Sequence, residues 1–68
     1  MLHGCTIYDK VLVGLGSEVM DWAEVREYTL IGAGSLVPSR KVLDGGLWVG
    51  RPVKKVRELT VQEKEHIV

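Results

Sequence analysis

One aliphatic column constrains the fold of this chain more than any other feature of its sequence. From residue 7 to residue 49, every sixth position is isoleucine, leucine or valine: Ile7, Val13, Val19, Val25, Ile31, Val37, Leu43 and Val49. A period of six matches neither the 3.6-residue helix nor simple strand alternation, although six is a multiple of two. The chain must therefore contain short straight segments that turn every six residues.

A second column runs two positions before the first. It carries small or compact residues through most of the chain: Cys5, Val11, Ser17, Ala23, Thr29 and Ser35. In a parallel β-helix each straight segment forms one side of a coil, the aliphatic side chain points into the prism, and the compact residue fits near the corner. The two columns predict an all-β fold, a parallel β-helix with both columns facing inward.

Glycines indicate how many sides each coil has. Gly14, Gly32 and Gly50 are spaced by eighteen residues, which is three segments of six. We expect these glycines to stack as one corner, because glycine tolerates backbone angles that other residues avoid. The spacing predicts a three-sided prism of about three 18-residue coils.

The start of the repeat lacks a recognisable cap. Its register is already running at Cys5 and Ile7, so no segment before it would cover the first strand edge. Unpaired strand edges invite pairing with other chains, and solenoids need a cap at each end. We expect either a partner over this edge or a longer protein of which this chain is the C-terminal fragment.

The end of the repeat carries clear stop signals. Pro52 marks the exit from the last coil, and Thr60-Val61-Gln62-Glu63 has the pattern of a capping box at a helix start. A short α-helix should follow from about residue 61. We therefore expect β-helix coils over residues 1–56 and a C-terminal helical segment over residues 57–68.

Charge and hydropathy exclude several classes of protein. Nine Lys and Arg balance nine Asp and Glu, which argues against a nucleic-acid partner. No apolar run approaches the roughly 18 residues of a membrane span, and the first residues lack the features of a signal peptide. We expect a cytoplasmic protein without a membrane partner, in which the single cysteine, Cys5, packs in the compact column.

One side of the predicted prism carries an apolar ladder. Residues just before the inward aliphatic column should face outward, and on this side they are Leu12, Leu30 and Trp48, again eighteen apart. The corresponding positions on the other two sides are mixed. An apolar ladder on one side suggests a subunit interface, the alternative being that the C-terminal helix lies over it.

Four segments of the chain carry a family resemblance. They are Leu2-His3-Gly4-Cys5-Thr6-Ile7, Val11-Leu12-Val13-Gly14-Leu15-Gly16-Ser17, Ile31-Gly32-Ala33-Gly34-Ser35-Leu36-Val37-Pro38 and Val49-Gly50-Arg51-Pro52-Val53-Lys54-Lys55-Val56-Arg57-Glu58-Leu59. Together they resemble the C-terminal portion of γ-class carbonic anhydrase-like proteins of the left-handed β-helix superfamily. The hexapeptide repeats and the closing pattern are shared with hexapeptide acyltransferases, whereas the first segment looks like the third metal-binding histidine of the γ class.

The resemblance implies a left-handed β-helix, a homotrimer, and zinc-type sites between subunits built from three histidines of two neighbouring chains. Three nitrogen ligands and one open position allow a metal to activate water for attack on carbon dioxide. His3 matches one of these ligands, and the other two would stand before residue 1. The metal candidate is therefore His3, with zinc or another divalent metal as the cofactor, and we expect this chain alone to lack a complete site and to be inactive.

Three functions remain open at this point. The chain resembles a truncated γ-carbonic anhydrase-like metalloprotein, but it could be a hexapeptide acyltransferase fragment using acyl-CoA, or a structural and oligomerisation module without chemistry. Ser17 and Ser35 belong to the inward column, so we expect neither to be a nucleophile. Asp21 stacks one coil from His3 and could orient its imidazole, or be a solvated corner residue, and His66 in the predicted helix is expected at the surface.

Overall fold

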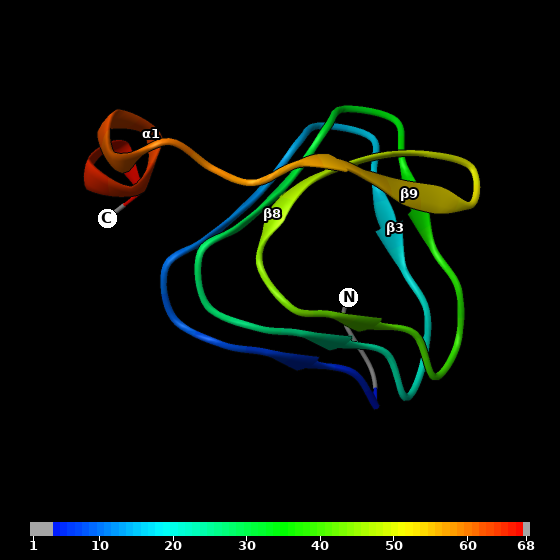
Figure 1. Cartoon of the computed structure of the whole chain (residues 1–68). Coiled ribbons are helices and arrows are strands. Elements are labelled where there is room, and N and C mark those ends of the chain that lie inside the picture. The colour runs from blue at the N-terminus through cyan, green and yellow to red at the C-terminus, as the bar shows by residue number, and fades with distance from the viewer. Residues whose placement is uncertain (1–3, 68) are drawn as a thin grey trace.

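The structure of the chain is a computed structural model, and it describes residues 4–67. These residues form nine short strands followed by one helix (Figure 1). The elements are β1 (Thr6–Ile7), β2 (Val11–Val13), β3 (Glu18–Val19), β4 (Glu24–Val25), β5 (Thr29–Ile31), β6 (Leu36–Val37), β7 (Val42–Leu43), β8 (Gly46–Gly50), β9 (Val53–Arg57) and α1 (Val61–His66).

Three sheets of stacked parallel strands form the sides of a prism. The sheets contain β1-β4-β7, β2-β5-β8 and β3-β6, with β9 added at the edge of the second sheet. Partners in adjacent coils are eighteen residues apart, as in the pairs Ile7 with Val25 and Val19 with Val37. Viewed along the coils, the three sides give the triangular outline of Figure 1. The predicted parallel β-helix is confirmed.

A residue with left-handed backbone closes each corner. Positive φ values between 58° and 78° recur every six residues, at Gly4, Lys10, Gly16, Trp22, Tyr28, Gly34 and Arg40. A single residue in this region redirects the chain sharply, at a cost of roughly 1–2 kcal/mol for a non-glycine residue. These residues turn the strands at the predicted period, and four of the seven are not glycine.

Gly14 and Gly32 serve a different purpose from the one that their spacing predicts. Neither has a left-handed φ, so the expectation that they bend the corner is wrong. A Cβ atom at Gly14 would lie 2.5 Å from the backbone nitrogen of Ala33, and one at Gly32 would lie 2.7 Å from Cγ1 of Val49. Close approach between coils therefore requires glycine at Gly14, whereas the Val49 side chain fills the space beside Gly32.

The core lies inside the prism and is built mainly from members of the two predicted columns, whereas Val49 of the aliphatic column is not part of it. Val25, Ile31, Val37 and Leu43 are at most 1% exposed. Thr29 and Ser35, from the compact column, are fully buried, and their hydroxyls donate to the carbonyls of Arg26 (2.7 Å) and Gly32 (2.6 Å). No buried side-chain nitrogen or oxygen among residues 4–67 lacks a hydrogen-bond partner. Local carbonyls thus satisfy the polar members of the column at little cost.

The last coil is one residue shorter than the others. Val25 pairs with Leu43 eighteen residues later, but Ile31 pairs with Trp48, only seventeen later. The shortening occurs where β7 runs into β8, since two residues connect these strands and three connect β4 to β5. Gly45 and Gly46 make this tighter corner with φ values of 100° and 94°.

This shorter corner changes which side chains face inward. Trp48 points into the prism at 7% exposure and donates from Nε1 to the carbonyl of Gly45 at 2.8 Å, whereas Val49 faces outward at 38% exposure. The prediction that Trp48 belongs to the outward ladder is therefore wrong, and Leu47 pairs with Leu30 in its place. For the same reason Gly50 is out of register with Gly32.

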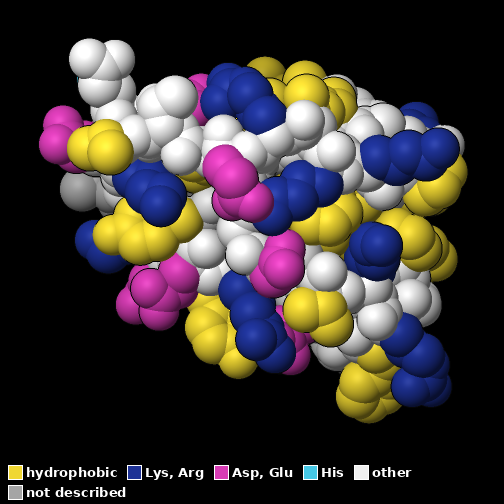
Figure 2. All heavy atoms as spheres, viewed as in Figure 1, with side chains coloured by type: hydrophobic (Ala, Val, Ile, Leu, Met, Phe, Trp, Pro, Cys, Tyr) yellow, Lys and Arg dark blue, Asp and Glu magenta, His cyan; other side chains and the backbone are white. Residues whose placement is uncertain are grey.

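The chain reverses direction after Gly50, and β9 pairs antiparallel with β8. Val53 is buried at 3% exposure, so β9 adds an apolar contact as well as backbone hydrogen bonds to the last coil. The opposite end of the prism is more open, with Val13 38% exposed (Figure 2 shows the surface from the β9 side). No helix within residues 4–67 is long and apolar enough to cross a membrane.

Candidate functional site

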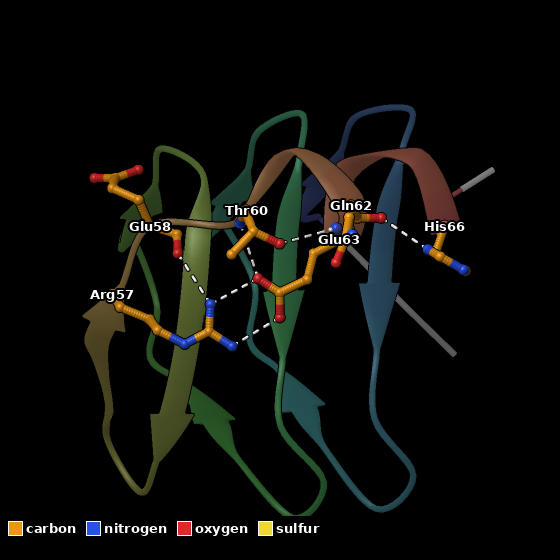
Figure 3. Close-up of polar contacts among 6 residues, drawn as sticks. All are labelled: Arg57, Glu58, Thr60, Gln62, Glu63 and His66. Carbon is orange, nitrogen blue, oxygen red and sulfur yellow. Dashed lines mark hydrogen bonds and ion pairs between the residues drawn. The ribbon is translucent and has the colours of Figure 1, made fainter.

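Helix α1 and the outward face of the β2-β5-β8 sheet enclose a groove beside the predicted ladder. Its volume is about 290 Å³, and its apolar walls come from Leu12, Leu30 and Ile67. Thr60, Gln62, Glu63 and His66 supply the polar rim. Figure 3 shows the helix crossing in front of the stacked strands, with these polar residues along it.

The start of α1 is fixed by the predicted capping box. The Glu63 amide donates to the Thr60 hydroxyl at 3.1 Å, and the Thr60 amide donates to Oε1 of Glu63 at 2.8 Å. Each bond satisfies an amide that the helix itself leaves without a partner. The capping box is confirmed, and it sets the first helical residue at Val61.

Arg57 ties the helix start to β9. Its Nη1 and Nη2 atoms donate to Oε1 and Oε2 of Glu63 at 2.6 and 2.7 Å (Figure 3). The Arg57 guanidinium, together with the Thr60 amide, lowers the pKa of Glu63 to about 2. Glu63 therefore stays ionised as a structural group, and its two oxygens are already occupied.

Two further contacts hold α1 against the coils. Ile67 follows the helix and is 6% exposed. The Lys64 ammonium lies 5.6 Å from the ring centroid of Tyr28, a corner residue that Lys10 also approaches, at 6.0 Å. Such cation–π contacts contribute roughly 0.5–1 kcal/mol at exposed sites. The helix is thus attached to the coils through Lys64 and Ile67, and the groove runs along its length from Thr60 to Ile67.

The groove can accept an apolar group but offers little acid–base chemistry. Nδ1 of His66 lies 2.7 Å from the carbonyl oxygen of Gln62, so Nδ1 donates its proton to this oxygen. Glu63 is engaged by Arg57 and Thr60. His66 is exposed, as expected from the sequence.

The structure places the three predicted interface residues in different environments. Leu12 is 54% exposed and Leu30 is half-buried beneath α1, so the helix covers part of the ladder and leaves the rest accessible. Trp48 lies inside the prism, as described above. Sequence reasoning missed Leu47, and the Gly45-Gly46 pair was the signal that could have revealed the shorter corner.

The predicted metal ligand, His3, lies outside the described residues. Its neighbour Gly4 sits over Asp21, because a Cβ atom at Gly4 would lie 3.4 Å from Cγ of Asp21. Within residues 4–67, no three His, Cys, Asp or Glu side chains lie close enough to share a metal ion. Residues 4–67 therefore do not form a complete metal centre.

The remaining candidates from the sequence have structural roles. Cys5 is half-buried against the core cluster. The Ser17 hydroxyl donates to the Gly32 carbonyl at 3.0 Å and accepts from the Ser35 amide at 3.2 Å, and the Ser35 hydroxyl accepts from the Gly50 amide at 3.2 Å. The two serines thus link successive coils across one corner.

Comparison with known proteins supports the fold and points to two kinds of relative. Protein YrdA of Escherichia coli is 55% identical over 65 residues, and mitochondrial Gamma carbonic anhydrase 2 of Arabidopsis thaliana is 37% identical over 68 residues. The matches cover 94% and 98% of this chain, but only 35% and 24% of those proteins. The chain thus spans about a third or less of the length of these relatives.

A solved structure gives the same picture. The crystal structure of a hexapeptide transferase family protein from Anaplasma phagocytophilum matches with a TM-score of 0.87 and 41% sequence identity, over 93% of this chain and 39% of that one. No family model matches the chain. The six-residue columns, the parallel β-helix and these similarities together support placing the chain in the hexapeptide-repeat superfamily.

Proposed function

We propose that this chain is the C-terminal part of a γ-carbonic anhydrase-like metalloprotein whose longer form hydrates carbon dioxide. The observation that carries the proposal is similarity to a γ-carbonic anhydrase along 98% of the chain. In this proposal the prism consists of about three left-handed coils, the protein is cytoplasmic, and the chain supplies the scaffold that closes the β-helix at β9 and α1.

His3 is the proposed metal ligand, with zinc or another divalent metal as the cofactor. A metal held by three imidazoles with one open position would lower the pKa of bound water towards neutrality. The described residues do not provide the other two imidazoles. In this proposal they come from residues upstream of this segment and from a neighbouring subunit, so the 68-residue chain alone is inactive.

We also propose a homotrimer in which the outward ladder contributes to the subunit interface. The ladder is revised to Leu12, Leu30 and Leu47, because Trp48 points inward. Exposure of Leu12 at 54% supports a partner on this face. Leu12→Glu should lower the mass measured by light scattering, whereas Val42→Glu, an exposed position on another side of the prism, should leave it unchanged.

The test of the enzymatic proposal compares the chain with a longer protein extended upstream. We expect the longer form to bind one zinc-type ion per subunit by elemental analysis and to accelerate carbon dioxide hydration, and the 68-residue chain to do neither. His3→Ala in the longer form should remove both metal and activity. Full activity of the His3→Ala protein would contradict the role of His3, and a metal-free, inactive longer form would contradict the enzymatic proposal.

A hexapeptide acyltransferase is the second candidate, supported by similarity to the hexapeptide transferase family structure. Such an enzyme would bind acyl-CoA, with a histidine as general base. Titration of the longer form with acetyl-CoA, followed by calorimetry, separates the two enzymatic candidates. Absence of both activities in a stable, metal-free oligomer would leave a structural module.

A further inference from the structure

Charge is distributed unevenly along the prism, although the net charge of the chain is zero. Between residues 38 and 57, which form the last coil and β9, six Lys and Arg residues stand against a single acidic residue, Asp44. Between residues 4 and 37, two basic residues stand against five acidic ones. The last coil and β9 are therefore basic and the earlier coils acidic, although Glu58 and Glu63, which follow β9, neutralise part of the basic charge.

Strand β9 is an edge strand at the basic end. It pairs with β8 on one side, and within residues 4–67 no strand pairs with its other side. Val53 is buried, but Lys54 is exposed and Val56 is 58% exposed. An edge of this kind offers unpaired backbone donors and acceptors together with basic and apolar side chains.

Several basic residues at this end already have acidic partners, and others do not. Lys55 lies 2.6 Å from Glu58 and 3.6 Å from Asp44, and Arg57 pairs with Glu63. Lys54 makes no ion pair with any described residue. In Figure 2, Lys and Arg side chains alternate with hydrophobic ones across the right half of the view, where Figure 1 places β9.

We propose that the free edge of β9 is a docking strand for an extended acidic segment of a partner protein. Addition of a strand to an exposed sheet edge gains affinity from backbone hydrogen bonds and specificity from alternate side chains. Lysine on an edge opposes pairing with a second β9, because like charges would face each other. The same lysine favours a strand that carries carboxylates on the face next to Lys54.

The probe for this docking strand is a capped peptide of eight residues in which glutamate and valine alternate. Added to the ¹⁵N-labelled chain, it should shift the amide signals of β9 in a saturable manner, and the affinity should fall at high salt because the charges are exposed. A peptide with lysine in place of glutamate should cause no shift. Methylation of alternate backbone nitrogens in the acidic peptide should abolish binding, because strand pairing requires those donors.

Variants of the chain test the role of charge on β9. Lys54→Glu should lower the affinity of the chain for the acidic peptide at least tenfold. Lys10→Glu makes the same charge change at a corner far along the prism and should leave this affinity unchanged. The amide spectrum of each variant reports whether it folds, and the methylated peptide gives a test on the unaltered chain. Equal binding of the acidic and basic peptides, unchanged affinity of Lys54→Glu, or tighter binding of an oligothymidine to the same amides would overturn the proposal.

Discussion

At one end of the prism Val13 is 38% exposed, whereas Ile31, its pairing partner in the next coil, is 1% exposed. The two residues occupy the same inward position of the repeat and are both aliphatic. At the other end, Trp48 takes this position in the last coil and is 7% exposed. Burial in a β-helix is therefore set by what lies above and below a coil, and only secondarily by the residue in the column.

The closed end shows what covers the last coil. Trp48 fills the interior with a larger side chain than its predecessors in the column, and the Lys41 ammonium lies 5.5 Å from the centroid of its ring. Strand β9 then occupies the free edge of β8. A bulky plug and a reversed strand thus replace the next coil, whereas the described residues place no corresponding elements over β2.

The largest expected effect on stability comes from removing the Trp48 side chain, which fills the interior of the last coil. Trp48→Ala should lower the free energy of unfolding by about 3–5 kcal/mol, because it removes a buried aromatic side chain and leaves a cavity. Val13→Ala should cost about 1 kcal/mol or less, since that side chain is already half accessible. Urea unfolding followed by far-ultraviolet circular dichroism measures both. Equal losses would mean that the two ends are equally well packed.

The next largest loss of stability should come from substitutions where two coils approach each other closely. Gly14→Ala places a Cβ atom against the Ala33 backbone, which cannot move without disturbing the next coil, and should cost about 1–3 kcal/mol. Gly34→Ala meets no atom within 4 Å but has φ of 70°, so it should cost about 1–2 kcal/mol. Gly34→Asn is the matched control, because asparagine tolerates this φ. Thermal unfolding ranks the three, and a fully stable Gly14→Ala protein would refute the close contact.

Helix α1 depends on its cap more than on its length. Thr60→Ala should destabilise the helix by about 1 kcal/mol, since the Glu63 amide loses its acceptor. Amide hydrogen exchange within α1 should accelerate, while exchange in β5 stays unchanged. Thr60→Ser, which keeps the hydroxyl, should behave as the parent chain. Faster exchange throughout the prism would show that the helix and the coils unfold together.

The smallest effect concerns pH. Since Arg57 and Thr60 lower the pKa of Glu63 to about 2, below its usual value of 4.5, ionised Glu63 stabilises the fold above pH of about 4.5. This contribution should diminish as the pH falls below 4.5 and be lost near pH 2. The carboxyl ¹³C shift of Glu63 should titrate with a midpoint near 2, and Arg57→Ala should raise that midpoint. A midpoint at the usual value in the parent chain would contradict the ion pair.

The repeat could be predicted from sequence wherever corner length was constant. The inward positions from Ile7 to Leu43 follow from counting by six, because each corner in that range is closed by one left-handed residue. Counting fails at the Gly45-Gly46 corner, since the count assumes a fixed corner and both Trp48 and Val49 suit an apolar interior. Hydropathy alone therefore does not reveal that a corner is one residue shorter.

The capping box and the groove beneath α1 differ in how far apart their residues lie. Thr60 and Glu63 are three residues apart, so the capping box could be predicted from local sequence. The groove depends on where α1 rests, and that is set by contacts such as Lys64 with Tyr28, which lie far apart in the chain. The site around His3 stays a prediction, because His3 lies outside the described residues.

The regular spacing of left-handed residues, from Gly4 to Arg40, has a consequence for how such a chain can change length. A tandem copy of any eighteen consecutive residues between these limits would add one coil and return every later side chain to its original direction. A copy of any odd length would turn the interior of all later strands towards water. Growth by gene duplication is therefore restricted to multiples of the six-residue repeat, except at a corner where glycines absorb the difference, as they do at Gly45 and Gly46.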